Sequence, residues 1–94
     1  MERIINGRST GKTKQLLELA KENGATVVCS NPVSMRAKAE NYGLIGINFI
    51  TYTDFFMNES QWTEDDKFYV DELENFVRFI SNNSLKGYTL TNED

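Results

Sequence analysis

Histidine is absent from the 94-residue chain, and cysteine and proline each occur once. The lack of histidine excludes acid–base catalysis and metal binding by imidazole. A single cysteine, Cys29, excludes an internal disulfide and a zinc site made of several cysteines. No apolar run approaches the roughly 20 residues of a membrane-spanning helix, and the first residues lack the apolar stretch of a signal peptide. We therefore expect a soluble cytoplasmic protein without a membrane partner.

Charge is distributed unevenly along the chain. Residues 1–38 contain seven Lys or Arg and three Glu, whereas residues 39–94 contain three Lys or Arg and eleven Asp or Glu. The net charge of −4 argues against nucleic acid as a partner, because non-specific binding to it requires a cluster of cations. The length, with 39% hydrophobic residues, predicts one globular domain over residues 1–94.

Short β-type runs alternate with helical patterns along the chain. The patterns predict strands over residues 3–5, 26–29, 48–52, 67–70 and 88–91, and helices over 12–23, 31–42, 53–57 and 73–80. Asn31 is expected to cap the second helix, with Pro32 in its first turn. Alternating strands and helices predict a three-layer α/β fold with a mainly parallel, five-stranded sheet. Ligands of such sheets bind beyond the carboxyl ends of the strands.

A tight loop joins the first predicted strand to the first predicted helix. It comprises Gly7, Arg8, Ser9, Thr10, Gly11, Lys12 and Thr13. Backbone N–H groups of such a loop and the helix N-terminus bind phosphates. Lys12 would contact the β- and γ-phosphates of ATP, and the Thr13 hydroxyl would bind Mg²⁺. Asn6 stands where the usual pattern has glycine, and the alternative is an ordinary turn followed by a chance Gly-Lys-Thr.

Two adjacent acids follow the strand predicted over residues 67–70. Asp71 at the strand end would hold Mg²⁺, directly or through water, as a hard oxygen ligand. Glu72 would orient and deprotonate the attacking water during hydrolysis of the γ-phosphate. The alternative is an acidic first turn of the next helix, where carboxylates interact favourably with the helix dipole. Thr89 and Thr91 either sense the γ-phosphate or are simply strand residues.

Five segments of the chain together resemble the first motor lobe of RecA-like helicases and phage terminases. They read IINGRSTGKT, TVVCSNP, FITYTDFF, FYVDELENF and GYTLT. Small P-loop proteins encoded by bacteriophages and prophages are similar to the chain in the same way. The resemblance implies that Gly7 to Thr13 form a Walker A loop and that Asp71 and Glu72 form a Walker B motif. It also implies a P-loop fold and, for a phage-encoded chain, a bacterial host cytoplasm.

These features favour a Mg²⁺-dependent ATP-binding protein whose hydrolysis is weak or depends on a protein partner or on self-association. No second lobe is expected, so an arginine finger would come from another subunit, with Arg8, Arg36 and Arg78 as candidates. A non-catalytic protein that uses a P-loop fold to bind a phage or host partner is one alternative. A nucleoside kinase-like phosphotransferase is another, although the chain lacks the zinc cysteines of the thymidine kinase type.

Overall fold

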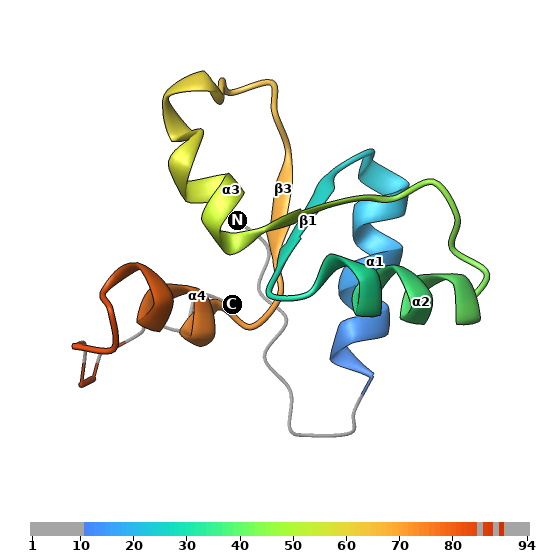
Figure 1. Ribbon diagram of the computed structural model, residues 1–94. Coiled ribbons are helices and arrows are strands. Elements are labelled where there is room, and N and C mark those ends of the chain that lie inside the picture. The colour runs from blue at the N-terminus through green and yellow to red at the C-terminus, as the bar shows by residue number, and fades with distance from the viewer. Residues whose placement is uncertain (1–10, 85, 88, 90–94) are drawn as a thin grey trace.

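Four α-helices, one short 3-10 helix and three strands form the part of the chain that this computed structural model describes, residues 11–84, 86, 87 and 89 (Figure 1). In chain order they are α1 (Lys12–Asn23), β1 (Thr26–Cys29), α2 (Pro32–Asn41), β2 (Asn48–Thr51), α3 (Tyr52–Met57), η1 (Glu59–Gln61), β3 (Phe68–Val70) and α4 (Leu73–Ile80). The alternation of strands and helices confirms the predicted α/β class.

Glycine bounds helix α1 at both ends. Gly11 precedes the helix with a φ of 77°, and Gly24 follows it with a φ of 64°. A residue without Cβ adopts these left-handed conformations at little cost. The N–H of Gly24 bonds to carbonyls of the last turn and so satisfies part of the helix end. The predicted range of this helix, residues 12–23, is confirmed.

Polar caps determine where α2 and α3 begin. The side chain of Asn31 accepts a hydrogen bond from the Ser34 N–H at 3.1 Å, which confirms the predicted cap. Thr51 does the same for α3, since its Oγ1 accepts from the Asp54 N–H at 3.0 Å. The predicted strand over 48–52 therefore ends at Thr51, and Tyr52 is the first residue of α3.

The sheet contains three parallel strands among the described residues, in the order β2-β1-β3. Thr26 of β1 pairs with Asn48 on one side and with Phe68 on the other. The described residues therefore contain three of the five predicted strands. The first predicted strand lies at residues 3–5, outside the described residues, as do most of 88–91. Thr89 is described and belongs to no strand, because β-propensity alone does not supply a pairing partner.

The two faces of the sheet are covered differently. Helices α1 and α2 cover one face and pack a buried aliphatic core that includes Leu17, Val27, Cys29 and Ala39. Helices α3 and α4 lie on the opposite side (Figure 1), where aromatic rings make the contacts. The Phe55 ring lies 4.8 Å from the Phe68 ring, and Trp62 lies at the same centroid distance from Phe68.

None of the helices in the described ranges combines the length and the apolar character that a membrane-spanning helix needs.

Candidate functional site

The carboxyl ends of β1 and β3 lie at one edge of the sheet, and α1 begins at the same edge (Figure 1). Strand β1 is central, because β2 pairs with it on one side and β3 on the other. The direction in which the chain adds strands therefore reverses at β1. In open parallel sheets, ligands bind beyond the carboxyl ends of the strands at such a reversal. Residues 11–13 and 71–72, predicted as site residues, lie at this edge.

The start of α1 presents backbone N–H groups without a capping side chain. Gly11 precedes the helix, has no side chain, and accepts the first helical hydrogen bond from the Gln15 N–H at 3.0 Å. The N–H groups of the first turn have no partner within a helix and carry its partial positive charge. Lys12 and Thr13 are half-buried in this turn. The remaining predicted loop residues, Gly7, Arg8, Ser9 and Thr10, lie outside the described residues.

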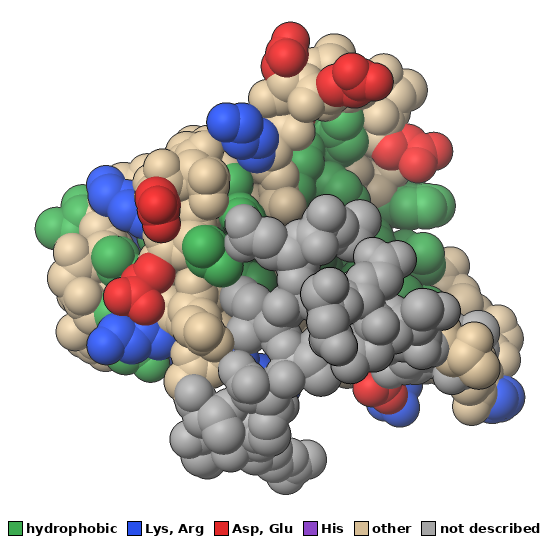
Figure 2. Space-filling view, turned by 180° about the vertical axis from the view of Figure 1, so that it is seen from behind, with side chains coloured by type: hydrophobic (Ala, Val, Ile, Leu, Met, Phe, Trp, Pro, Cys, Tyr) green, Lys and Arg blue, Asp and Glu red, His purple; other side chains and the backbone are tan. Residues whose placement is uncertain are grey.

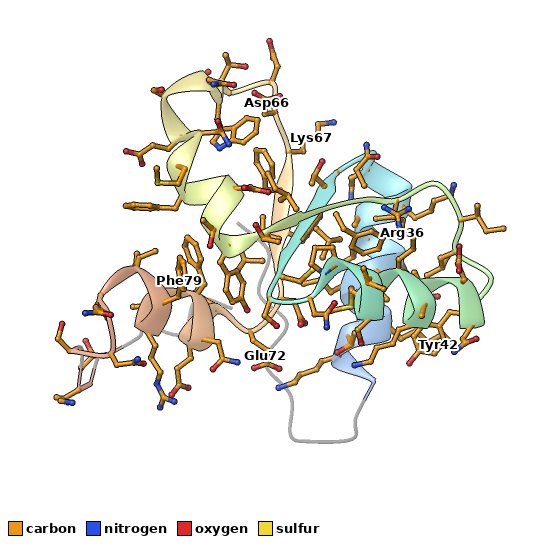
Figure 3. All side chains as sticks on the ribbon, in the orientation of Figure 1. Arg36, Tyr42, Asp66, Lys67, Glu72 and Phe79 are labelled. Atoms are coloured by element: carbon orange, nitrogen blue, oxygen red, sulfur yellow. The ribbon has the colours of Figure 1, made fainter. Side chains whose placement is uncertain are left out.

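Lys12 and Glu72, the two residues predicted to be catalytic, form an ion pair. The Lys12 Nζ lies 3.6 Å from the Glu72 Oε1, and their side chains are 35% and 44% exposed. An ion pair this exposed adds little stability, because water screens it and both long side chains lose freedom. Its significance is positional, since it joins the start of α1 to the segment after β3. Glu72 and the far end of β3, marked by Asp66 and Lys67, are well separated (Figure 3).

The backbone of Glu72 adopts a conformation that its residue type disfavours. Its φ is 56° and its ψ is 66°, in the left-handed region. For an L-residue with a Cβ this conformation costs about 1–2 kcal/mol. Such outliers gather at functional sites, where the surrounding structure holds them in place. The sequence carries no signal for it, because glycine or asparagine is the usual residue in this region.

Tyr52 holds the backbone of both acids from the α3 side. Its hydroxyl donates to the Asp71 carbonyl at 2.7 Å, and the Glu72 carbonyl lies 3.4 Å from the same oxygen. The side chain is buried, and its ring contacts the rings of Phe76 and Phe79 on α4. Sequence reasoning assigned Tyr52 to a strand and missed this role. In the sequence, the only sign of this role is that an aromatic residue with a hydroxyl directly follows a strand.

Asp71 continues the β3 ladder past the end of the strand and is half-buried. Its N–H donates to the Val28 carbonyl at 2.9 Å. Burial raises the pKa of its carboxyl above the ordinary 3.8, and the negative charge of Glu72 raises it further. The positive charges of Lys38 and Lys12 act in the opposite direction on the pKa of Asp71. The ionised carboxylate is therefore disfavoured here, and a nearby cation would stabilise it.

Two further groups respond to the charge of Asp71. Burial raises the pKa of the Cys29 thiol, and Asp71 adds to the effect. Burial likewise raises the pKa of the Tyr52 hydroxyl to about 12, with added contributions from Asp71 and then from Cys29 and Glu72. Both groups therefore stay protonated at neutral pH. Neither is a nucleophile there, and Cys29 is a buried strand residue as predicted.

The described residues contain no group of three or more His, Cys, Asp or Glu side chains that could enclose a metal ion. A magnesium site does not need one, because Mg²⁺ keeps several waters and takes one or two protein oxygens plus phosphate oxygens. Thr13 starts α1 and Asp71 follows β3 at the same edge. A hydroxyl and a carboxylate are hard oxygen ligands, so the chemistry of this pair fits Mg²⁺.

The described arginines that were considered as site residues have other surroundings. The Arg36 guanidinium lies 5.2 Å from the centroid of the Phe49 ring. Arg78 donates to the Glu74 carboxylate at 2.7 Å, one helical turn away. Figure 3 shows that Arg36 lies far from Glu72. Arg8 and Thr91 lie outside the described residues.

No family model matches this sequence, and no curated protein and no solved structure matches it either.

Proposed function

We propose that the chain binds a nucleoside triphosphate, with ATP as the expected ligand, at the edge where α1 begins and β3 ends. One observation carries the proposal: Lys12 and Glu72, far apart in the sequence, meet at 3.6 Å beside an uncapped helix N-terminus. Apart from Gly11 and its chain neighbours, no atom of the described residues lies within 4 Å of the position of a Cβ on Gly11, so these residues leave the backbone there open to a ligand. The motif over Gly7 to Thr13 and its likeness to Walker A loops support the same reading.

The charges at this edge fit a phosphate and a divalent cation together. The amino end of α1 and the Lys12 ammonium attract phosphate oxygens. Burial, and then the negative charge of Glu72, disfavour the ionised form of Asp71 and raise its pKa, so a cation between Asp71 and the phosphates would stabilise the carboxylate. Mg²⁺ would neutralise charge on the β- and γ-phosphates when bound. Thr13 and Asp71 are the residues that would hold it.

Hydrolysis by the isolated chain is expected to be slow. Glu72 is the group that would orient and deprotonate water, but here its carboxylate faces Lys12. Among the described arginines, Arg36 lies over an aromatic ring and Arg78 is bound to Glu74. An arginine directed at the γ-phosphate accounts for about 10³–10⁵ of the rate in enzymes that use one. We therefore propose that the chain has a P-loop fold of RecA-like type and acts in the cytoplasm. In this proposal it hydrolyses ATP slowly alone and faster with a partner.

Thermal unfolding with and without Mg²⁺–ATP tests the proposal. A ligand that binds only the folded state stabilises it, by about 2.7 kcal/mol at a concentration of 100 Kd. Wild type should therefore unfold at a higher temperature with millimolar Mg²⁺–ATP. Lys12→Ala should abolish the shift. Lys14→Ala is the matched control, because Lys14 belongs to the same helical turn but lies 5.7 Å from the Tyr42 ring centroid. Circular dichroism establishes that both variants fold.

Two results would contradict the proposal. One is a wild-type melting temperature that Mg²⁺–ATP leaves unchanged. The other is an equal loss of the shift in Lys12→Ala and Lys14→Ala, which would indicate general attraction to a basic surface. Radiolabelled ATP with and without deoxynucleosides separates hydrolysis from phosphotransfer, because only a kinase would label the nucleoside. Tight binding without turnover would leave a nucleotide-binding protein that acts without catalysis.

A further inference from the structure

Helix α4 carries an apolar stripe that the described residues cover only in part. Leu73, Phe76, Val77 and Ile80 recur at the spacing of one helical face, yet no residue of α4 is buried. Leu73, Phe79 and Ile80 are exposed. An isolated helix of eight residues is unstable in water and normally depends on burial of such a face. The stripe therefore has capacity for further contacts.

Helix α3 packs against α4 and carries two exposed apolar side chains of its own. Phe56 and Met57 are both exposed, and Met57 is 71% exposed. Phe56 lies one helical turn after Tyr52, whose ring centroid is 6.2 Å from that of Phe79. Figure 3 shows Phe79 between α4 and α3. We call Phe56, Met57, Phe79 and Ile80 the α3–α4 face.

Acidic side chains lie close in sequence to the α3 part of the α3–α4 face, and the described residues from β2 onward are acidic in balance. The described residues from β2 onward contain eight Asp or Glu and three Lys or Arg. Of these three bases, Arg78 is paired with Glu74, and Lys86 donates to the Asn83 carbonyl. Asp54 on α3 and Glu59 in η1 are exposed close in sequence to Phe56 and Met57. Figure 2 shows hydrophobic atoms at the surface on this side of the molecule, with an acidic side chain beside them.

We propose that the α3–α4 face binds a cationic amphipathic helix of another protein. Such a helix has large apolar residues along one side and Lys or Arg beside them. Its apolar side covers Phe56, Met57, Phe79 and Ile80, and its cations meet Asp54 and Glu59. Complementary charge favours this occupant and speeds its approach. This inference does not depend on nucleotide binding at Lys12.

Charge also distinguishes this occupant from two others. A second copy of the chain meeting the face through its own α3 and α4 would bring acidic side chains together, and like charges across an interface are costly. An anionic lipid surface would be repelled for the same reason, because such surfaces attract basic segments. Of these three occupants, a cationic helix is the one that both the apolar residues and the acidic side chains attract.

The experiment measures binding of two designed helical peptides to the full chain. Both peptides carry the same leucine stripe, but one is flanked by lysine and the other by glutamate. Fluorescence of Trp62, the only tryptophan, reports binding because its ring stacks on Phe55 of α3 at 6.2 Å. The lysine peptide should bind at least about tenfold more tightly than the glutamate peptide. Its affinity should fall as salt is added, since screening weakens exposed charge pairs.

Paired variants locate the binding surface. Met57→Gln with Ile80→Gln removes apolar contact from residues that are 71% and 42% exposed. We expect this double variant to weaken binding of the lysine peptide about tenfold, because apolar anchors dominate such interfaces. Val33→Gln with Ile45→Gln is the matched control on the other side of the sheet, where the residues are 81% and 69% exposed. It should bind within about twofold of wild type.

Three outcomes would overturn the proposal. Equal affinity for the two peptides would show that charge does not select the occupant. Unchanged binding by the Met57→Gln, Ile80→Gln variant, with circular dichroism confirming the fold, would place the contact elsewhere. Concentration-dependent dimerisation of the chain alone, measured by sedimentation and lost in that variant, would make a second copy the occupant.

Discussion

The two sides of the sheet differ in what they bury and in the charge that they present. On the α1–α2 side, aliphatic residues such as Leu17, Val27 and Ala39 are almost completely buried. On the α3–α4 side, Tyr52 is the buried helical residue, and the rings of Phe55 and Phe76 are only partly covered. Four of the six lysines lie on α1 and α2, whereas eight of the eleven described acids lie in residues 52–80, from α3 to α4. The α1–α2 side therefore supplies most of the stability, whereas the α3–α4 side leaves apolar surface available.

The residues that join the two sides form the candidate site. Lys12 belongs to the α1–α2 side, Tyr52 to the α3–α4 side, and Asp71 and Glu72 lie between them. At this junction, the geometry that brings the charged groups together is not the most stable one. Substitutions at the two sides and at the junction should therefore change the free energy of unfolding by different amounts and in different directions.

The largest expected effect separates the two sides directly. Leu17→Ala should lower the free energy of unfolding by about 2–5 kcal/mol, because the side chain is 0% exposed and its loss leaves a cavity. Ile80→Ala, an equivalent deletion on α4, should cost under about 1 kcal/mol, since that side chain is already in contact with water. Urea unfolding of both variants measures the difference. Equal losses would mean that α4 contributes to the core as much as α1 does.

The second effect concerns the left-handed residue at the junction. Glu72→Gly should raise the free energy of unfolding by about 1 kcal/mol relative to Glu72→Ala, because both lose the carboxylate but only glycine loses the Cβ. The φ of 56° is the reason for this expectation. Urea unfolding of the two variants provides the comparison. If alanine and glycine were equally stable, the backbone at this position would not be under strain.

The third effect tests the hydroxyl that crosses from α3 to the junction. Tyr52→Phe removes the hydrogen bond to the Asp71 carbonyl and should cost about 0.5–1.5 kcal/mol. Tyr42→Phe is the control, because Tyr42 is exposed at the end of α2. Thermal unfolding should show a loss only for Tyr52→Phe. A matching loss for both would point to a general effect of the substitution.

The smallest effect is a change in pH dependence. A folded-state pKa of Asp71 above its ordinary 3.8 means that the folded protein holds this proton to higher pH than the unfolded chain does. The stabilisation from this proton is complete below the ordinary pKa and is lost as pH rises through the folded-state pKa. Asp71→Asn should therefore be more stable than wild type at pH 7, and the difference should disappear in acid. Melting curves from pH 3 to pH 7 test this, and parallel profiles would contradict it.

Glycines and capping residues in the sequence predicted those helices whose ends are determined by neighbouring residues. Gly11 and Gly24 bound α1 through their own backbone conformations, and Asn31 caps α2 three residues from its partner. The boundary at Tyr52 was wrong, because the Thr51 cap outweighed the strand preference of tyrosine. The fifth strand, predicted from β-propensity, depends on pairing with distant residues. Propensity alone does not determine such pairing.

The candidate site was predictable in its residue types and less so in its geometry. Motif spacing placed Lys12, Asp71 and Glu72 at one edge of the sheet, and the structure brings Lys12 and Glu72 into contact. The positive φ of Glu72 and the hydrogen bond from Tyr52 could not be predicted. Both depend on the packing of α3 against the end of β3, which involves residues about 20 positions apart.

Glu72 also makes two contacts with different helices, one with α1 and one with α4. Its carboxylate faces Lys12, while its carbonyl accepts the Phe76 N–H at 3.2 Å, the first hydrogen bond of α4. A ligand that draws Lys12 away from Glu72 acts on the residue from which α4 begins. If the ligand changes the affinity of the protein for a peptide bound to α4, thermodynamic linkage requires the reverse effect as well. The peptide must then change the affinity for the ligand by the same factor. The coupling free energy between the two sites is therefore measurable from either end, without any observation of movement.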